Sequence, residues 1–189
     1  MLLCLFLPFS ARAEISVNIT EGKIEPLPIA ITTFHVAPDG DRTLAQQIPE
    51  VITNNLKRTG LFEPVNPRAF IQDPASLSED GPRYAEWRAI NAPALVTGTV
   101  TRSADGQARV EFRLWDVFSE KQLIGMAYTT TQQNWRRIAH IISDEIYKRL
   151  TGEEGYFDSR IVYIAESGQG PKKVKRLAIM DQDGHNHHY

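Results

Sequence analysis

The chain has 189 residues, with 21 Lys and Arg against 23 Asp and Glu, and a formal net charge of −2. This near balance argues against a strongly basic protein that binds duplex nucleic acid through its charge. Cys4 is the only cysteine, which excludes a disulfide scaffold. No run of about 18 apolar residues occurs, so we expect no direct membrane insertion of the mature protein. The length accommodates one domain of ordinary size and a short remainder.

The first thirteen residues have the features of a secretory signal. Residues 1–9 are almost entirely apolar, and Ala11 and Ala13 flank Arg12 in the small-x-small pattern that signal peptidase recognises. We therefore expect a signal peptide over 1–13, with cleavage between Ala13 and Glu14. The charged segment that ordinarily precedes the apolar run is missing, so the true start codon lies upstream in this interpretation. A buried N-terminal strand and a lipoprotein signal ending at Cys4 are the alternatives. Export without cysteine suits the periplasm of a Gram-negative bacterium.

A short N-terminal arm follows, with a linker that extends to residue 27. Apolar and polar residues alternate along it, which is typical of an extended segment with one apolar face. Breaker residues then separate the arm from the next apolar run, so the arm can dock on its own domain or add a strand to the sheet of a partner. The residues of the arm are Glu14, Ile15, Ser16, Val17, Asn18, Ile19 and Thr20.

The pattern of apolar and turn residues over 28–156 predicts a mixed α/β domain. The apolar positions at 44–56 have helical spacing, Gly60 occupies a C-cap position, and Pro49 is expected in the first turn of this helix. Gly106 marks a hairpin turn between two strand-like runs. The other expected elements are strands at 28–34, 61–65, 94–101, 107–118 and 123–131, a loop at 66–82, and helices at 84–90 and 135–150.

This order predicts an α+β fold, in which a mixed β-sheet is covered on one face by two or three helices. Residues 157–189 have a different pattern, with strands expected at 160–166 and 174–180 and a turn at 181–184. Because an isolated hairpin is marginal in water, we expect further strands to follow and interpret the chain as a piece of a longer protein.

Several stretches together resemble the TolB family of the periplasmic Tol–Pal system. They extend from the signal peptide into the last hairpin, and their combination is far more specific than any single motif. The stretches that carry the resemblance are 54–62 (NNLKRTGLF), 96–100 (VTGTV), 113–117 (RLWDV), 143–152 (SDEIYKRLTG), 160–164 (RIVYI) and 180–184 (MDQDG).

The resemblance implies an N-terminal α/β domain followed by a six-bladed β-propeller, of which residues 157–189 are a partial first blade. It also implies a non-enzymatic scaffold that links inner-membrane Tol proteins to the outer-membrane lipoprotein Pal during cell division. The arm, 14–20, would bind the C-terminal domain of TolA by strand addition. Pal would bind the propeller, so no Pal-binding residue can be placed here. The alternative hypothesis is a nucleotide- or nucleic-acid-binding α+β module.

No residue pattern predicts a catalytic, cofactor or metal site. His185, His187 and His188 lack an accompanying carboxylate or cysteine shell. His140 and Asp144 are four residues apart on a predicted helix, with Ser143 next to Asp144 in the sequence. Because successive helix residues diverge by about 100°, a catalytic triad is not expected, and His140 and Asp144 are expected to form a surface pair. The Lys-rich segment 172–176 is expected to be a solvated hairpin tip. The remaining aromatic candidates, expected in the core or half-buried, are Trp87, Trp115 and Trp135.

Overall fold

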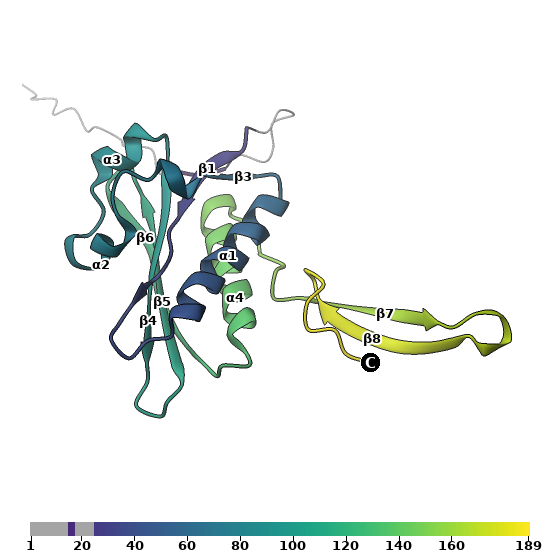
Figure 1. Cartoon of the computed structure of the whole chain (residues 1–189). Coiled ribbons are helices and arrows are strands. Elements are labelled where there is room, and N and C mark those ends of the chain that lie inside the picture. The colour runs from purple at the N-terminus through teal and green to yellow at the C-terminus, as the bar shows by residue number, and fades with distance from the viewer. Residues whose placement is uncertain (1–14, 18–24) are drawn as a thin grey trace, which may run out of the picture.

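The computed structural model describes residues 15–17 and 25–189. A mixed sheet flanked by helices forms an α/β domain, and a long β-hairpin extends from its helical side (Figure 1). The strands of the sheet are β1 (Leu27–Ile31), β2 (His35–Val36), β3 (Phe62–Pro64), β4 (Ala94–Arg102), β5 (Ala108–Asp116) and β6 (Lys121–Thr130).

The strand order is β3-β1-β4-β5-β6, and β2 pairs with β4 beyond the end of β1. Strands β1, β2 and β3 are joined in parallel pairs, β1 with β3 and both β1 and β2 with β4. The pairs β4–β5 and β5–β6 are antiparallel, as their short connections require. The predicted mixed sheet is therefore confirmed, and β2 is a short strand that the sequence pattern did not indicate.

Helices α1 (Arg42–Arg58) and α4 (Trp135–Thr151) pack side by side on one face of this sheet. The carboxylate of Asp41 accepts hydrogen bonds from the N–H groups of Thr43 and Leu44, which caps the N-terminus of α1. Gly152 ends α4 in the left-handed conformation. The main core lies between helices and sheet, and its fully buried members include Ile48, Ile52, Leu56, Phe112, Leu114, Ile142 and Ile146.

Pro49 lies in the middle of α1, whereas the sequence pattern placed it in the first turn. A proline in a helix lacks the N–H group that would bond to the carbonyl four residues earlier. Here that carbonyl, on Ala45, accepts a hydrogen bond of 3.0 Å from the N–H of Phe34. The helix can therefore continue through Pro49 because a neighbouring segment satisfies the acceptor that it leaves open.

A smaller core lies on the other face of the sheet, where helix α3 (Tyr84–Ala89) places Trp87 against Ala30, Leu95 and Val117. Ala30 and Leu95 alternate along their strands with the residues that face α1 and α4, so they lie on the opposite side of the sheet, and Val117 directly follows β5. The helices thus cover both faces, rather than one face as expected. The segment before α3 contains the short helix α2 (Leu77–Asp80), with 3-10 turns at 67–69 and 74–76.

Gln72 organises this segment, which was predicted only as a loop. Its side chain is buried, and its Oε1 accepts hydrogen bonds of 2.8 Å from both Trp87 Nε1 and the N–H of Arg83. Its Nε2 donates to the carbonyl of Gly81 at 2.9 Å and to Ser76 Oγ at 3.2 Å. One amide side chain therefore fixes both the loop and the indole of the second core.

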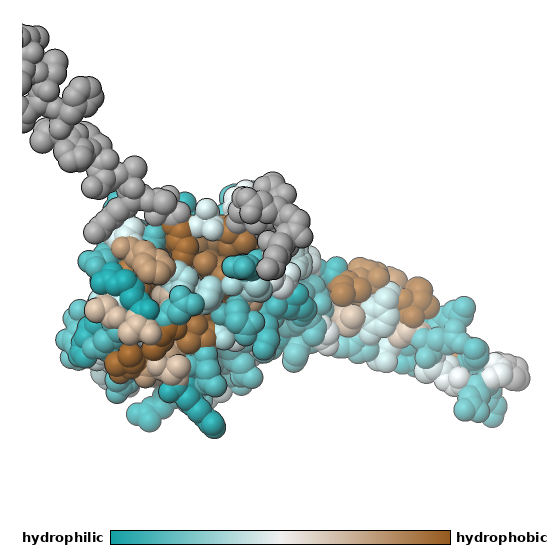
Figure 2. All heavy atoms as spheres, turned by 90° about the horizontal axis from the view of Figure 1, so that it is seen from above, coloured by the Kyte–Doolittle hydropathy of each residue, from teal (hydrophilic) through white to brown (hydrophobic). Residues whose placement is uncertain are grey.

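Strands β7 (Arg160–Ser167) and β8 (Val174–Asp181) form the antiparallel hairpin. A 3-10 turn at 170–172 closes its tip. Several of its apolar side chains are more than two-fifths exposed, namely Ile161, Val162, Ile164, Val174 and Leu177. Figure 2 shows brown surface along the hairpin, separate from the α/β domain.

Candidate functional site

The described part of the N-terminal arm, residues 15–17, lies against its own domain. The N–H of Val17 donates to the carbonyl of Leu150 at the end of α4 at 2.8 Å. The N–H of Ile15 donates to Asp116 Oδ2 at the end of β5 at 3.2 Å. Val17 is buried in the main core, Ile15 is half-buried against it, and Ser16 is exposed. The alternation expected from the sequence is thus present over these three residues.

The other predicted arm and cleavage positions lie outside the described residues. They are Ala13, Glu14, Asn18, Ile19 and Thr20. The two interpretations of the arm were docking on its own domain and addition to a partner's sheet. Residues 15–17 are docked on the domain, and their addition to a partner's sheet would first require release from this position.

Asp116 anchors the arm and also the turn between β5 and β6. Its Oδ1 accepts hydrogen bonds from the N–H groups of Phe118 at 2.9 Å and Ser119 at 3.1 Å, while Oδ2 accepts from Ile15. Burial alone would raise the pKa of the Asp116 carboxyl, but the hydrogen bonds from Ser119, Ile15 and Phe118 together lower it below its ordinary value. The carboxylate is therefore held in its charged form.

A second polar site lies where the hairpin meets the helices. We call it the helix recess and define it by Asn55 and Arg58 of α1 with Arg136 and His140 of α4. Asn55 Oδ1 accepts hydrogen bonds from Arg58 Nη2 at 3.0 Å and from Gln182 Nε2 at 3.3 Å. Because Arg58 can only donate, this contact fixes the orientation of the Asn55 amide. Asn55 Nδ2 then donates to His140 Nδ1 at 2.9 Å and to Ser143 Oγ at 3.0 Å.

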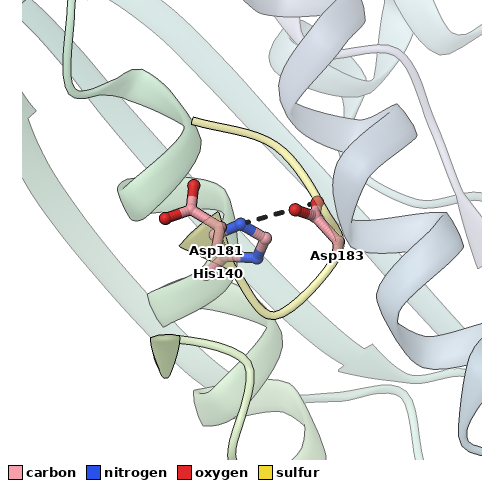
Figure 3. A group of neighbouring side chains, drawn as sticks. All are labelled: His140, Asp181 and Asp183. Carbon is pink, nitrogen blue, oxygen red and sulfur yellow. Dashed lines mark ion pairs between the residues drawn. The ribbon is translucent and has the colours of Figure 1, made fainter. Parts of the chain in front are cut away.

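Two carboxylates of the hairpin lie next to His140, as Figure 3 shows. The nearest ligand atoms of His140, Asp181 and Asp183 are all within 4.8 Å of one another, a grouping that could in principle hold a metal ion. His140 Nε2 is 3.7 Å from Asp183 Oδ2 and has no hydrogen-bond partner among the described residues. The same Oδ2 accepts a hydrogen bond from Arg136 Nη2.

These contacts favour an ion pair over a metal site. The guanidinium of Arg136 already neutralises Asp183 and would repel a cation bound there. Since Nδ1 of His140 accepts from Asn55, the neutral ring carries its proton on Nε2, the atom that a metal would need unprotonated. Burial lowers the pKa of the His140 imidazole, and Arg136 acts in the same direction, whereas Asp183, Asp181 and Asp158 oppose them. The ring is thus held neutral beside an acidic turn.

The surface pair predicted for His140 and Asp144 is wrong. His140 is buried in the helix recess, because it shares the inward face of α4 with Ala139 and Ser143. Asp144 instead accepts hydrogen bonds from the N–H groups of Phe157 at 2.7 Å and Asp158 at 3.0 Å, which ties down the start of the hairpin segment. Burial raises the pKa of Asp144. The available signal was that His140 and Ser143 interrupt the apolar face of a helix.

The other candidates have structural roles. The ring of His187 lies between Tyr163 and Tyr189, with ring centroids 5.7 and 4.7 Å apart. At the hairpin tip, Lys173 and Lys175 pair with Glu166, and the predicted solvated tip is confirmed. Trp87 is buried, and Trp115 and Trp135 are half-buried, as expected. Among the described residues, every helix is too short or too polar to span a bilayer.

Fold and sites together define a class of protein: an α+β domain that holds an N-terminal arm and docks a β-hairpin on its helices. The family model of the TolB amino-terminal domain matches residues 15–123. That match covers more than half of the chain, and the chain belongs to this family.

The relatives extend the match beyond the family model. The chain is 52% identical to the Tol-Pal system protein TolB of Paramagnetospirillum magneticum over 179 residues, which are 95% of this chain and 40% of that protein. Its structure is similar to the crystal structure of TolB from Acinetobacter baumannii, with a TM-score of 0.71 and 26% identity over 92% of this chain and 40% of the other. The chain therefore spans about two-fifths of the length of both relatives.

Proposed function

We propose that this chain serves the Tol–Pal system as a periplasmic, non-enzymatic binding protein whose arm, residues 14–20, binds the C-terminal domain of TolA. The observation that carries the proposal is the arm itself. At 15–17 the side chains of Ile15 and Val17 pack against the core of the domain, while Ser16 between them is exposed. A segment of this kind can add to the open edge of a sheet, with backbone hydrogen bonds giving affinity and alternate side chains filling pockets.

Binding to a partner in this way would compete with the docked position of the arm. Release breaks the hydrogen bonds from Val17 to Leu150 and from Ile15 to Asp116, and it exposes the Val17 side chain. The hydrogen bond to Leu150 contributes about 1 kcal/mol net and the one to the charged Asp116 about 1.5–3 kcal/mol, because water replaces the lost partner. A new sheet would pair the same N–H groups and cover the same apolar side chains. The cost of release is therefore small enough for a partner strand to repay.

The test measures binding of the TolA C-terminal domain by calorimetry. Deletion of 14–20 should abolish binding, and the double variant Ile15→Ser/Val17→Ser should weaken it at least about tenfold, since it removes buried apolar area. Ser16→Ala is the matched control, because Ser16 is exposed and its replacement leaves the apolar face intact.

Val17 belongs to the core, so circular dichroism must show that each variant remains folded. A synthetic peptide of residues 14–20 gives a measurement that does not depend on the domain. The peptide should compete with the intact chain for TolA. Unchanged affinity after the deletion, in a folded protein, would exclude the arm as the TolA site.

We further propose that residues 1–13 are an export signal cleaved between Ala13 and Glu14, and that the longer relatives bind Pal through a propeller and thereby contribute to envelope integrity and cell division. The family resemblance supports these points. Mass spectrometry of protein recovered from the periplasm should give Glu14 as the first residue. A polypeptide made of residues 14–189 alone should not retain Pal in a pull-down, because the proposed Pal site lies in the propeller.

A further inference from the structure

The turn that follows β8 makes specific contacts with both helices of the α/β domain. Gln182 Oε1 accepts a hydrogen bond of 2.7 Å from Arg58 Nη2, and Gln182 Nε2 donates to Asn55 Oδ1 on α1. Asp183 pairs with Arg136 on α4 and lies beside His140 (Figure 3). Two successive side chains of one turn thus contact two helices that are far apart in the sequence.

The pair of Arg136 and Asp183 is largely withdrawn from water. Its side chains are 15% and 11% exposed, and the side chain of His140 is 3% exposed. The neighbouring pair of Arg137 and Asp158 differs, since the Arg137 side chain is 65% exposed. Exposed ion pairs contribute little because water and salt screen them, whereas removing one partner of a withdrawn pair leaves an unpaired charge with little solvation.

The turn is shaped to present these side chains. Gly184, in the left-handed conformation at φ +86°, donates its N–H to the carbonyl of Asp181 at 2.9 Å. The N–H of Asp181 donates to the carbonyl of His185, and that of Gln182 donates to the carbonyl of Ser159. Because the backbone of the turn is bonded within the hairpin, its side chains are free to bind the helices.

We propose that the helix recess is a recognition site for an acidic β-turn, and that Asp183 docked in it fixes the orientation of the hairpin relative to the α/β domain. Arg136 supplies the charge that selects a carboxylate. Arg58 and Asn55 select the neighbouring amide of Gln182, since Arg58 donates to its oxygen and Asn55 accepts from its nitrogen. His140, whose Nδ1 accepts a hydrogen bond from Asn55, fills the space beside the carboxylate with a buried ring. This role is independent of the arm and of TolA.

The first measurement is the distance between two spin labels in the full chain. Labels at Thr43→Cys on α1 and Gln169→Cys at the hairpin tip, both exposed positions, are placed in a Cys4→Ser background. The parent should give one narrow distance distribution. Asp183→Asn and Arg136→Met should broaden it, while Arg137→Met, the adjacent and exposed control, should leave it unchanged.

Hydrogen exchange gives a second measurement. Protection of the Asp181 and Gln182 amides should fall about tenfold or more in Asp183→Asn, the effect expected for loss of a charged hydrogen bond. Asp183 lies outside the domain core, so this variant tests docking without removing a core contact. A parent distribution that is already broad, or an Asp183→Asn variant that keeps the narrow distribution and full protection, would overturn the proposal.

Discussion

The α/β domain and the hairpin β7–β8 are both built from strands rich in apolar residues, but they keep those residues in different environments. In the domain, Phe112 and Leu114 of β5 are fully buried beneath α4 and α1. In the hairpin, Leu177 is 65% exposed. Apolar residues in a strand favour burial but do not supply the layer that covers them. The domain is therefore held by its core, whereas the hairpin is held on the domain by polar contacts at its base, where Asp144 binds the backbone at 157–158 and the turn after β8 binds both helices.

The largest change in the free energy of unfolding, and the clearest difference between the two regions, should come from Phe112→Ala. Phe112 is fully buried and stacks on Tyr128 with ring centroids 6.4 Å apart. Removing such a side chain leaves a cavity and should cost about 3–5 kcal/mol in the free energy of unfolding. Val162→Ala in the exposed part of the hairpin should change it by less than about 0.5 kcal/mol. Urea denaturation of both variants measures the difference, and equal effects would mean that the hairpin shares the core of the domain.

A smaller effect is expected at Gln72, where polar contacts rather than apolar area are lost. Gln72→Leu would leave Trp87 Nε1 and the N–H of Arg83 without their acceptor. Unsatisfied buried donors should lower the free energy of unfolding by about 1–3 kcal/mol. The exposed Gln133→Leu is the control and should have almost no effect. If thermal melts of the two variants coincided, the loop would not depend on Gln72.

The arm should respond to the charge of Asp116. The folded state lowers the pKa of this carboxyl, so its contribution to stability is present above the unfolded pKa of about 3.9 and is lost as the pH falls through the folded pKa. Asp116→Asn should therefore reduce the loss of stability in acid, and it should weaken the hydrogen bond that holds Ile15. Unfolding curves between pH 2 and pH 7 would measure this change. A profile that is identical in parent and variant would contradict the anchoring role of the carboxylate.

The smallest expected effect concerns His140 and the helix recess. Its pKa is lowered in the folded state, so folding is favoured while the ring is neutral, above the unfolded pKa of about 6.5, and stability falls as the pH drops through the folded pKa. His140→Gln keeps an acceptor for Asn55 and should flatten the profile between about pH 5 and pH 7. Thermal melts across this range test the expectation. A steeper loss in the variant would show that protonation of His140 stabilises the fold.

The sequence predicts the elements of the fold better than the way in which they are joined. Strands β4 to β6 and helix α4 appear where alternation, helical spacing and the glycines at 106 and 152 place them. The position of α3 on the far face was not predicted, because its short apolar pattern does not say which side of the sheet it meets. Strand β2 has only two residues, which is too few for a detectable period.

The two candidate sites also differ in how well the sequence predicts them. The apolar face of the arm is predicted by local alternation, and residues 15–17 have it. The helix recess was missed because its partners Asn55, His140 and Asp183 come from three distant segments of the sequence. Pairings over such separations depend on the tertiary packing of α1 against α4, which a single sequence does not specify.

Pro49 provides a connection between two parts of the domain. By leaving the carbonyl of Ala45 without a helical donor, it creates an acceptor on the side of α1 that meets the end of β1. The N–H of Phe34 uses that acceptor just where the chain passes from β1 to β2. The position of Phe34 between β1 and β2 therefore depends on Pro49, which lies fifteen positions further along the chain. The hydrogen bond that Pro49 leaves unmade within α1 is thus replaced by one that holds the end of β1 against this helix.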